Sequence, residues 1–184
     1  MRLGLLVAVS VTAAALAAGC GGDSSQSAAA EEWADGVCTA ITTWKTDVAA
    51  ISTEAAKAIT EPGATRGDVT TAVDDGLQAT ETLVDDLQKL GPPDTPEGAD
   101  AKKEIDAFLE DAEGSADEVR TTLAGLPETG SVTALVTELS GLATNLQSTI
   151  ESGRALVNTL QDLGGDLRDG FENAESCQEL RAAS

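Results

Sequence analysis

The sequence predicts an all-α protein: an antiparallel four-helix bundle with a short C-terminal fifth helix linked to the first helix by a disulfide. In four long segments, apolar residues recur mostly at spacings of three and four, which places them on one face of an α-helix. Proline or glycine separates the segments, and none shows the alternating pattern of a strand. Aromatic residues make up 2% of the chain, so we expect an aliphatic core.

Residues 1–20 have the organisation of an export signal. Arg2 precedes an uncharged run of apolar and small residues, as in secretory signal peptides. The LAAGC that ends this segment resembles the lipobox of bacterial lipoproteins, with Ala17 where leucine is usual. The resemblance implies that residues 1–19 are a cleaved signal peptide and that the Cys20 thiol carries diacylglycerol. It also implies a lipid-anchored protein on the outer face of the cytoplasmic membrane.

Two other interpretations of this segment stay open: a secretory signal with a chance cysteine, and an uncleaved membrane span. A span needs roughly 20 predominantly apolar residues, and this stretch is slightly shorter and rich in Ala and Gly. The overall residue usage resembles that of small secreted lipoproteins of actinobacteria. Residues 20–30 have no large apolar side chain. We therefore expect a flexible tether there, followed by a helical domain at 31–184.

The formal net charge of −21 opposes nucleic-acid binding, which requires patches of Lys and Arg. The same charge favours cations and basic protein partners. Histidine is absent, which removes the commonest general base and transition-metal ligand. No phosphate-binding glycine loop or Cys-x-x-Cys motif occurs. We therefore expect no enzyme activity, no cofactor and a monomeric protein.

Cys38 and Cys177 are the cysteines that remain when Cys20 is lipidated. An exported domain meets oxidising conditions, which favours a disulfide between them. The alternative is two separate buried thiols. A bridge would close a loop of about 140 residues, which stabilises a fold by up to ~5 kcal/mol on the loop-entropy model.

The first predicted helix covers about residues 28–60. Glu31 and Glu32 lie in its first turn, where acidic side chains complement the helix dipole, and Pro62 with Gly63 ends it. Its apolar face has the heptad spacing of left-handed helix packing and consists of Val37, Ile41, Trp44, Val48, Ile51, Ala55 and Ala58.

The second predicted helix covers about residues 66–90. Thr65 and Asp68 approximate a capping box at its start, and the Gly91-Pro92-Pro93 sequence stops it. Its apolar face consists of Val69, Val73, Leu77, Leu83, Leu87 and Leu90.

The third predicted helix starts at Thr95, a capping residue, followed by Pro96, whose missing N–H is not needed at that position. It continues to about Leu126, and residues 127–130 form the next turn. Its inward residues are Ala101, Ile105, Phe108, Ala112, Val119, Leu123 and Leu126.

The fourth helix begins near Ser131, and its leucines hold one heptad phase that continues through Ala174 to Cys177. In a bundle it returns to the start of the first helix near Gly164-Gly165, after about 33 residues. A straight continuation would carry Cys177 roughly 20 Å past Leu163, too far to bridge Cys38. We therefore expect a break at the glycine pair and a fifth helix over about 166–181 that folds back. The leucines in phase are Leu135, Leu139, Leu142, Leu146, Leu156, Leu160, Leu163 and Leu167.

Acidic residues on the second and third helices form the best candidate for a binding surface. On each helix they are spaced to share one side, opposite the apolar face, and the short connection between the helices makes them neighbours. A divalent cation or a basic partner would offset the repulsion of like charges. The alternative is an ordinary solvated surface. We name this surface the acidic face, and its residues are Asp74, Glu81, Asp85, Asp106, Glu110, Glu113 and Asp117.

These observations predict a non-enzymatic interaction or binding module of the cell envelope, held at the membrane through Cys20. It would present a helical surface to another protein. The alternative is a small-ligand or divalent-cation binding domain that uses the bundle interior or the acidic face. A ligand binder is expected to contain an internal pocket, whereas an adaptor is expected to expose an apolar patch of several hundred Å².

Overall fold

The computed structural model describes residues 22–60, 65–125 and 132–182. Within these residues the protein contains six helices and no strand, which confirms the all-helical class. The predicted signal peptide and Cys20 lie outside the described residues. The side chains of the fourth-helix leucines before residue 147 also lie outside the described part.

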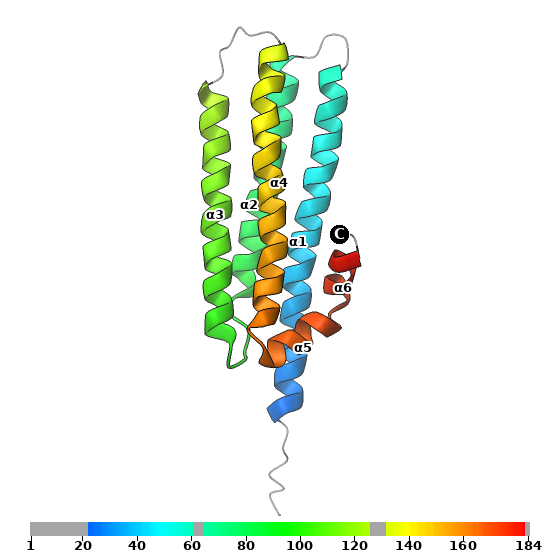
Figure 1. The fold of residues 1–184 in the computed structure, drawn as a ribbon, viewed down its shortest axis with the longest axis vertical. Coiled ribbons are helices and arrows are strands. Elements are labelled where there is room, and N and C mark those ends of the chain that lie inside the picture. Colours follow the sequence, from blue (N-terminus) through cyan, green and yellow to red (C-terminus); the bar gives the residue numbers. More distant parts are fainter. Residues whose placement is uncertain (1–21, 61–64, 126–131, 183–184) are drawn as a thin grey trace, which may run out of the picture.

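Four long helices run side by side along the molecule (Figure 1). The first packs along the second, the second along the third and the third along the fourth, while the fourth touches the first at few points. Two short helices follow, one across the foot of the first helix and one against its side (Figure 1). In chain order the helices are α1 (Gly22–Thr60), α2 (Arg66–Leu90), α3 (Gly98–Gly125), α4 (Val132–Asp162), α5 (Gly165–Asn173) and α6 (Glu175–Ala182).

Helix α1 begins earlier than the sequence predicted. The expected start was near Ala28, after a tether at 20–30, whereas the helix extends back to Gly22. Alanine is the best helix former, and the run of three alanines at 28–30 continues the helix. Ala30 is fully buried, because Gly170 of α5 lies so close that a Cβ there would meet the Ala30 carbonyl at 2.7 Å. Packing against α5 thus stabilises the turn of α1 around Ala30, which composition alone had assigned to the tether.

Helix α2 begins as predicted, and the capping box at its start is confirmed. The Asp68 N–H donates to Thr65 Oγ1 over 3.4 Å, and the Thr65 N–H donates to the Asp68 carboxylate over 2.8 Å. The Thr65 hydroxyl also donates to this carboxylate over 2.7 Å. Hydrogen bonds from the hydroxyl and then the backbone of Thr65 lower the pKa of Asp68 below its ordinary value.

Helix α3 starts at Gly98, three residues after the predicted cap at Thr95. The Thr95 hydroxyl is buried and has no hydrogen-bond partner among the described residues, so it does not accept the capping hydrogen bond from the first turn of the helix. The Gly98 N–H instead donates to the Thr95 carbonyl over 3.0 Å. Residues 95–97, predicted to begin the helix, therefore form a turn before it. Gly98 is buried against the preceding loop, where a Cβ would lie 2.2 Å from the Pro93 carbonyl oxygen. The close loop packing therefore displaced the helix start.

The chain breaks after α4 at Gly164, as the disulfide argument required. Gly164 and Gly165 have φ of 84° and 55°, conformations that favour glycine. The predicted single fifth helix was wrong, because Ala174 separates two short helices. The physical reason lies on α1. Asp35 accepts a hydrogen bond from the Ser176 N–H over 3.3 Å, and its carbonyl accepts one from the Ser176 hydroxyl over 3.0 Å. This contact caps and reorients α6.

The disulfide between Cys38 and Cys177 is present, with the two Cα atoms 5.0 Å apart. It joins α6 to α1 within the main hydrophobic core. Trp33 packs edge-on against Phe171 with ring centroids 5.9 Å apart, and its indole N–H donates to the Gly91 carbonyl over 2.8 Å. The foot of the molecule, where α5 and α6 lie, is therefore held by a disulfide, an aromatic contact and a partly buried hydrogen bond.

No helix in the described ranges combines the length and apolar character that a membrane crossing requires.

Candidate functional site

A cavity of about 580 Å³ lies among α1, α2, α3 and α4. It occupies the half of the long helices remote from the disulfide and from α5. On α1 its described lining extends from Trp44 to Ala56, and on α2 from Val69 to Thr80. Helix α3 contributes residues between Ala112 and Val119, and α4 contributes residues between 147 and 154. Most of these side chains are apolar.

Small side chains explain why this half of the molecule is hollow. In the half next to the disulfide, Val37, Ile41 and Trp44 are buried. Further along the same face of α1, Ile51 and Ala55 are only half-buried and line the cavity. Alanine and glycine face them from the other helices, at Ala72, Gly76, Ala112 and Ala116. In this half, the described side chains of the predicted apolar faces line a cavity instead of being fully buried.

The base of the cavity is marked by an internal hydrogen-bond chain. The Trp44 indole N–H donates to Thr80 Oγ1 over 3.2 Å, and the Thr80 hydroxyl donates to the Gly76 carbonyl over 3.0 Å. Trp44 and Thr80 are buried, with 2% and 8% of their surface exposed. This chain satisfies the polar groups of the cavity base on the α1–α2 side and fixes the indole against the cavity.

The opposite side of the cavity base carries Arg154, a cation with no ion-pair partner among the described residues. Arg154 of α4 lines the cavity and is half-buried. Its Nε atom is buried and has no hydrogen-bond partner in the described part of the chain. Glu151, three residues before it, also lines the cavity, but no ion pair joins the two among the described residues. A half-buried guanidinium beside apolar side chains is costly unless something pairs with it.

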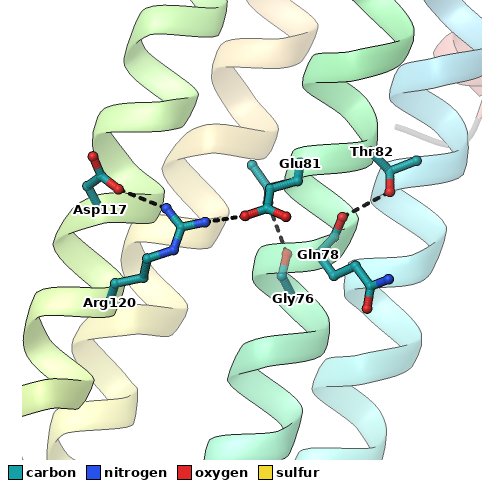
Figure 2. Close-up of polar contacts among 7 residues, drawn as sticks. Gly76, Gln78, Glu81, Thr82, Asp117 and Arg120 are labelled. Atoms are coloured by element: carbon teal, nitrogen blue, oxygen red, sulfur yellow. Dashed lines mark hydrogen bonds and ion pairs between the residues drawn. The ribbon is translucent and has the colours of Figure 1, made fainter.

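The acidic face forms on α2 and α3, but basic residues partly neutralise it. Arg120 of α3 pairs with Asp117 on its own helix over 2.8 Å and with Glu81 across on α2 (Figure 2). Lys102 pairs with Asp106 through a 2.7 Å hydrogen bond, and Lys89 lies 4.0 Å from Asp85. Arg120 therefore links α3 to α2 through Glu81 on this face.

Asp74, Glu110 and Glu113 complete the acidic face, and all three side chains are exposed. Across the described residues, no three His, Cys, Asp or Glu side chains come together in a way that would hold a metal ion. A metal centre on this face therefore has no geometric basis in that part of the chain.

No family model, curated protein or solved structure matches this chain. The functional assignment consequently depends on the geometry of the cavity and the surface. The sequence singled out neither the cavity nor Arg154. The clustering of Ala and Gly on the second and third predicted helices was the available signal, but it becomes informative only when those residues face one another.

Proposed function

We propose that this protein is a lipid-anchored, extracytoplasmic binding protein that holds a small apolar ligand among its four long helices. These helices are interpreted as an antiparallel four-helix bundle, closed at its foot by the disulfide and the two short helices. The protein performs no chemistry on the ligand in this account. The observation that carries the proposal is the apolar cavity of about 580 Å³.

The size and composition of the cavity support ligand binding. Sites for small molecules are commonly ~300–1,000 Å³ and mainly apolar, with a few placed polar groups. Empty space of this size costs stability, because its lining loses packing contacts. A bound apolar molecule would recover those contacts, which is the physical reason for expecting an occupant.

The basic-protein alternative has weaker support. Arg120, Lys102 and Lys89 already pair with Glu81, Asp117, Asp106 and Asp85. Exposed ion pairs contribute little energy, so exchanging them for contacts with a partner would yield little affinity. Small-ligand binding in the interior is therefore the function the geometry favours.

The proposed lipid anchor on Cys20 would determine how the cavity is oriented relative to the membrane. Helix α1 begins at Gly22, two residues after the proposed lipid attachment at Cys20. The foot of the molecule would then face the membrane, and the cavity would lie in the half directed away from it. Comparison of the intact mass and membrane fractionation of the native protein with those of a Cys20→Ala variant tests this part. A native protein that is soluble and unacylated would contradict it.

Trp44 provides a direct reporter for ligand binding. The chain has two tryptophans and no tyrosine, and only Trp44 lines the cavity. In a Trp33→Phe variant, titration with 12-bromododecan-1-ol, whose bromine quenches indole fluorescence on contact, should quench Trp44 with saturation. In a Trp44→Phe variant, Trp33 at the foot should stay unquenched over the same concentrations.

A matched pair of alanine substitutions controls for surface binding. Ala116 of α3 lines the cavity, whereas Ala107 of the same helix is exposed. In the Trp33→Phe background, Ala116→Leu should weaken quenching by filling the cavity, and Ala107→Leu should leave it unchanged. Equal quenching of Trp33 and Trp44, or equal behaviour of the two alanine variants, would reject the proposed function.

A further inference from the structure

We propose that the ligand is a single-chain carboxylate amphiphile whose carboxylate pairs with the Arg154 guanidinium and whose alkyl chain lies along the cavity. This inference rests on the proposed function, because it names the chemical class of the molecule in the same site. It is carried by an unpaired cation and an elongated apolar space that meet at the cavity base.

The unsatisfied charge of Arg154 indicates an anionic headgroup. Its guanidinium forms no ion pair and no hydrogen bond within the described part of the chain, and its Nε is buried. It is also the only cation among the described residues that line the cavity. A guanidinium presents a planar set of donors that matches a carboxylate with two parallel hydrogen bonds. An anionic headgroup would therefore satisfy a donor for which the described residues supply no acceptor.

The shape of the cavity indicates the rest of the ligand. Its lining on α1 extends from Trp44 to Ala56, which is about 18 Å of helix at 1.5 Å per residue. The side chains along this length are mainly Ala, Val, Ile and Leu. An alkyl chain fits a long and apolar space better than a compact ring system of the same volume would.

The surrounding charges limit the headgroup to one negative charge. Glu151 lines the same cavity one helical turn from Arg154, and the whole chain has a formal net charge of −21. A headgroup with two negative charges would still have only Arg154 as a cationic partner among the described cavity residues. Both of its charges would be repelled by Glu151 and by the negative charge of the protein. A carboxylate balances Arg154 with a single charge, so we place a carboxylate there rather than a phosphate monoester.

Two probes that differ only in the headgroup test this inference. In the full-length Trp33→Phe protein, the quenching of Trp44 gives the affinities for 2-bromododecanoate and for 2-bromododecan-1-ol, whose bromine lies next to the headgroup and therefore near Trp44 at the cavity base. We expect the carboxylate to bind roughly 10- to 100-fold more tightly, the range of one charge-assisted interaction. Arg154→Gln should reduce carboxylate affinity to that of the alcohol and leave alcohol affinity within about twofold.

Arg168→Gln is the matched control, because Arg168 is an exposed cation on α5 outside the cavity. It should preserve the preference for the carboxylate. Equal affinities for the two probes in the parent protein would overturn the headgroup assignment while leaving the proposed function intact. An equal loss for both probes in Arg154→Gln, or the same loss in Arg168→Gln, would also overturn it. Failure of both probes to quench Trp44 would reject the proposed function itself.

Discussion

The Trp44 indole on α1 and the Thr80 hydroxyl on α2 are joined by a buried hydrogen bond of 3.2 Å. This contact lies at the boundary between two halves of the molecule. Towards the disulfide, large side chains such as Ile41, Leu83 and Leu87 are fully buried. Away from it, Ala and Gly leave the cavity. The Trp44–Thr80 pair therefore closes the core and forms the base of the proposed binding site.

Thr80→Val should destabilise the protein by about 1–3 kcal/mol, because it leaves the buried Trp44 N–H without its acceptor. Thr82→Val is the matched control. Thr82 also donates to a carbonyl of its own helix, that of Gln78 over 2.9 Å (Figure 2), but it is exposed, so its loss should cost no more than about 0.5 kcal/mol. Urea unfolding gives both values, and equal changes would contradict the assigned role of Thr80.

Reduction of the Cys38–Cys177 disulfide should lower the free energy of unfolding by about 2–5 kcal/mol. The bridge spans 139 residues and holds α6 against α1, so its loss releases a long loop in the unfolded chain. Thermal melts with and without reductant measure the change. Titration of thiols on the unfolded protein provides the control. Both cysteines titrating before reduction would show that the bridge does not form.

Gly170→Ala should destabilise the protein by about 1–3 kcal/mol, because the new Cβ would lie 2.7 Å from the Ala30 carbonyl group. The backbone cannot yield there without separating α5 from α1. Gly114→Ala on α3 is the opposite case, since nothing lies within 4 Å of its Cβ position. That variant should be more stable than the parent by about 0.5–1 kcal/mol. Destabilisation by both substitutions would contradict the close contact of α5 with α1.

The capping box of α2 should make a pH-dependent contribution to stability. Hydrogen bonds from Thr65 lower the folded-state pKa of Asp68 below its ordinary value of 3.8. The contribution is therefore present above pH 3.8 and is lost as the pH falls through the lower pKa of the folded state. The melting temperature of the parent should exceed that of Asp68→Asn at neutral pH, and the gap should close in acid. Thr65→Val should show the same convergence, and a gap that widened in acid would contradict the assignment.

The sequence predicted those helix ends that are determined by residues next to them in the chain. Thr65 and Asp68 determine the start of α2, and the glycine pair at 164–165 allows the break after α4. The start of α6 was not predictable in this way, because Asp35, which accepts the Ser176 N–H, lies far away in the chain. The early start of α1 likewise depends on the approach of α5 to Ala30.

The candidate site was less predictable than the helices. Periodicity identifies which side of a helix faces inward, as at Ile51 and Leu77, but it does not determine whether the opposing side chains fill the space between them. Small residues such as Ala72 on α2 and Ala116 on α3 line the cavity and leave that space open. Arg154 carried no signal in the sequence, since its meaning comes from the lack of an acidic partner among the described residues that surround it.

The location of a bound probe tests the central claim most directly. Crystals of the oxidised protein grown with 12-bromododecan-1-ol would give the position of the bromine from its anomalous scattering. We predict a bromine inside the space lined by Trp44, Ala72 and Ala116. An empty cavity at saturating probe, or bromine only on the outer surface of the helices, would contradict the claim that this space is a binding site.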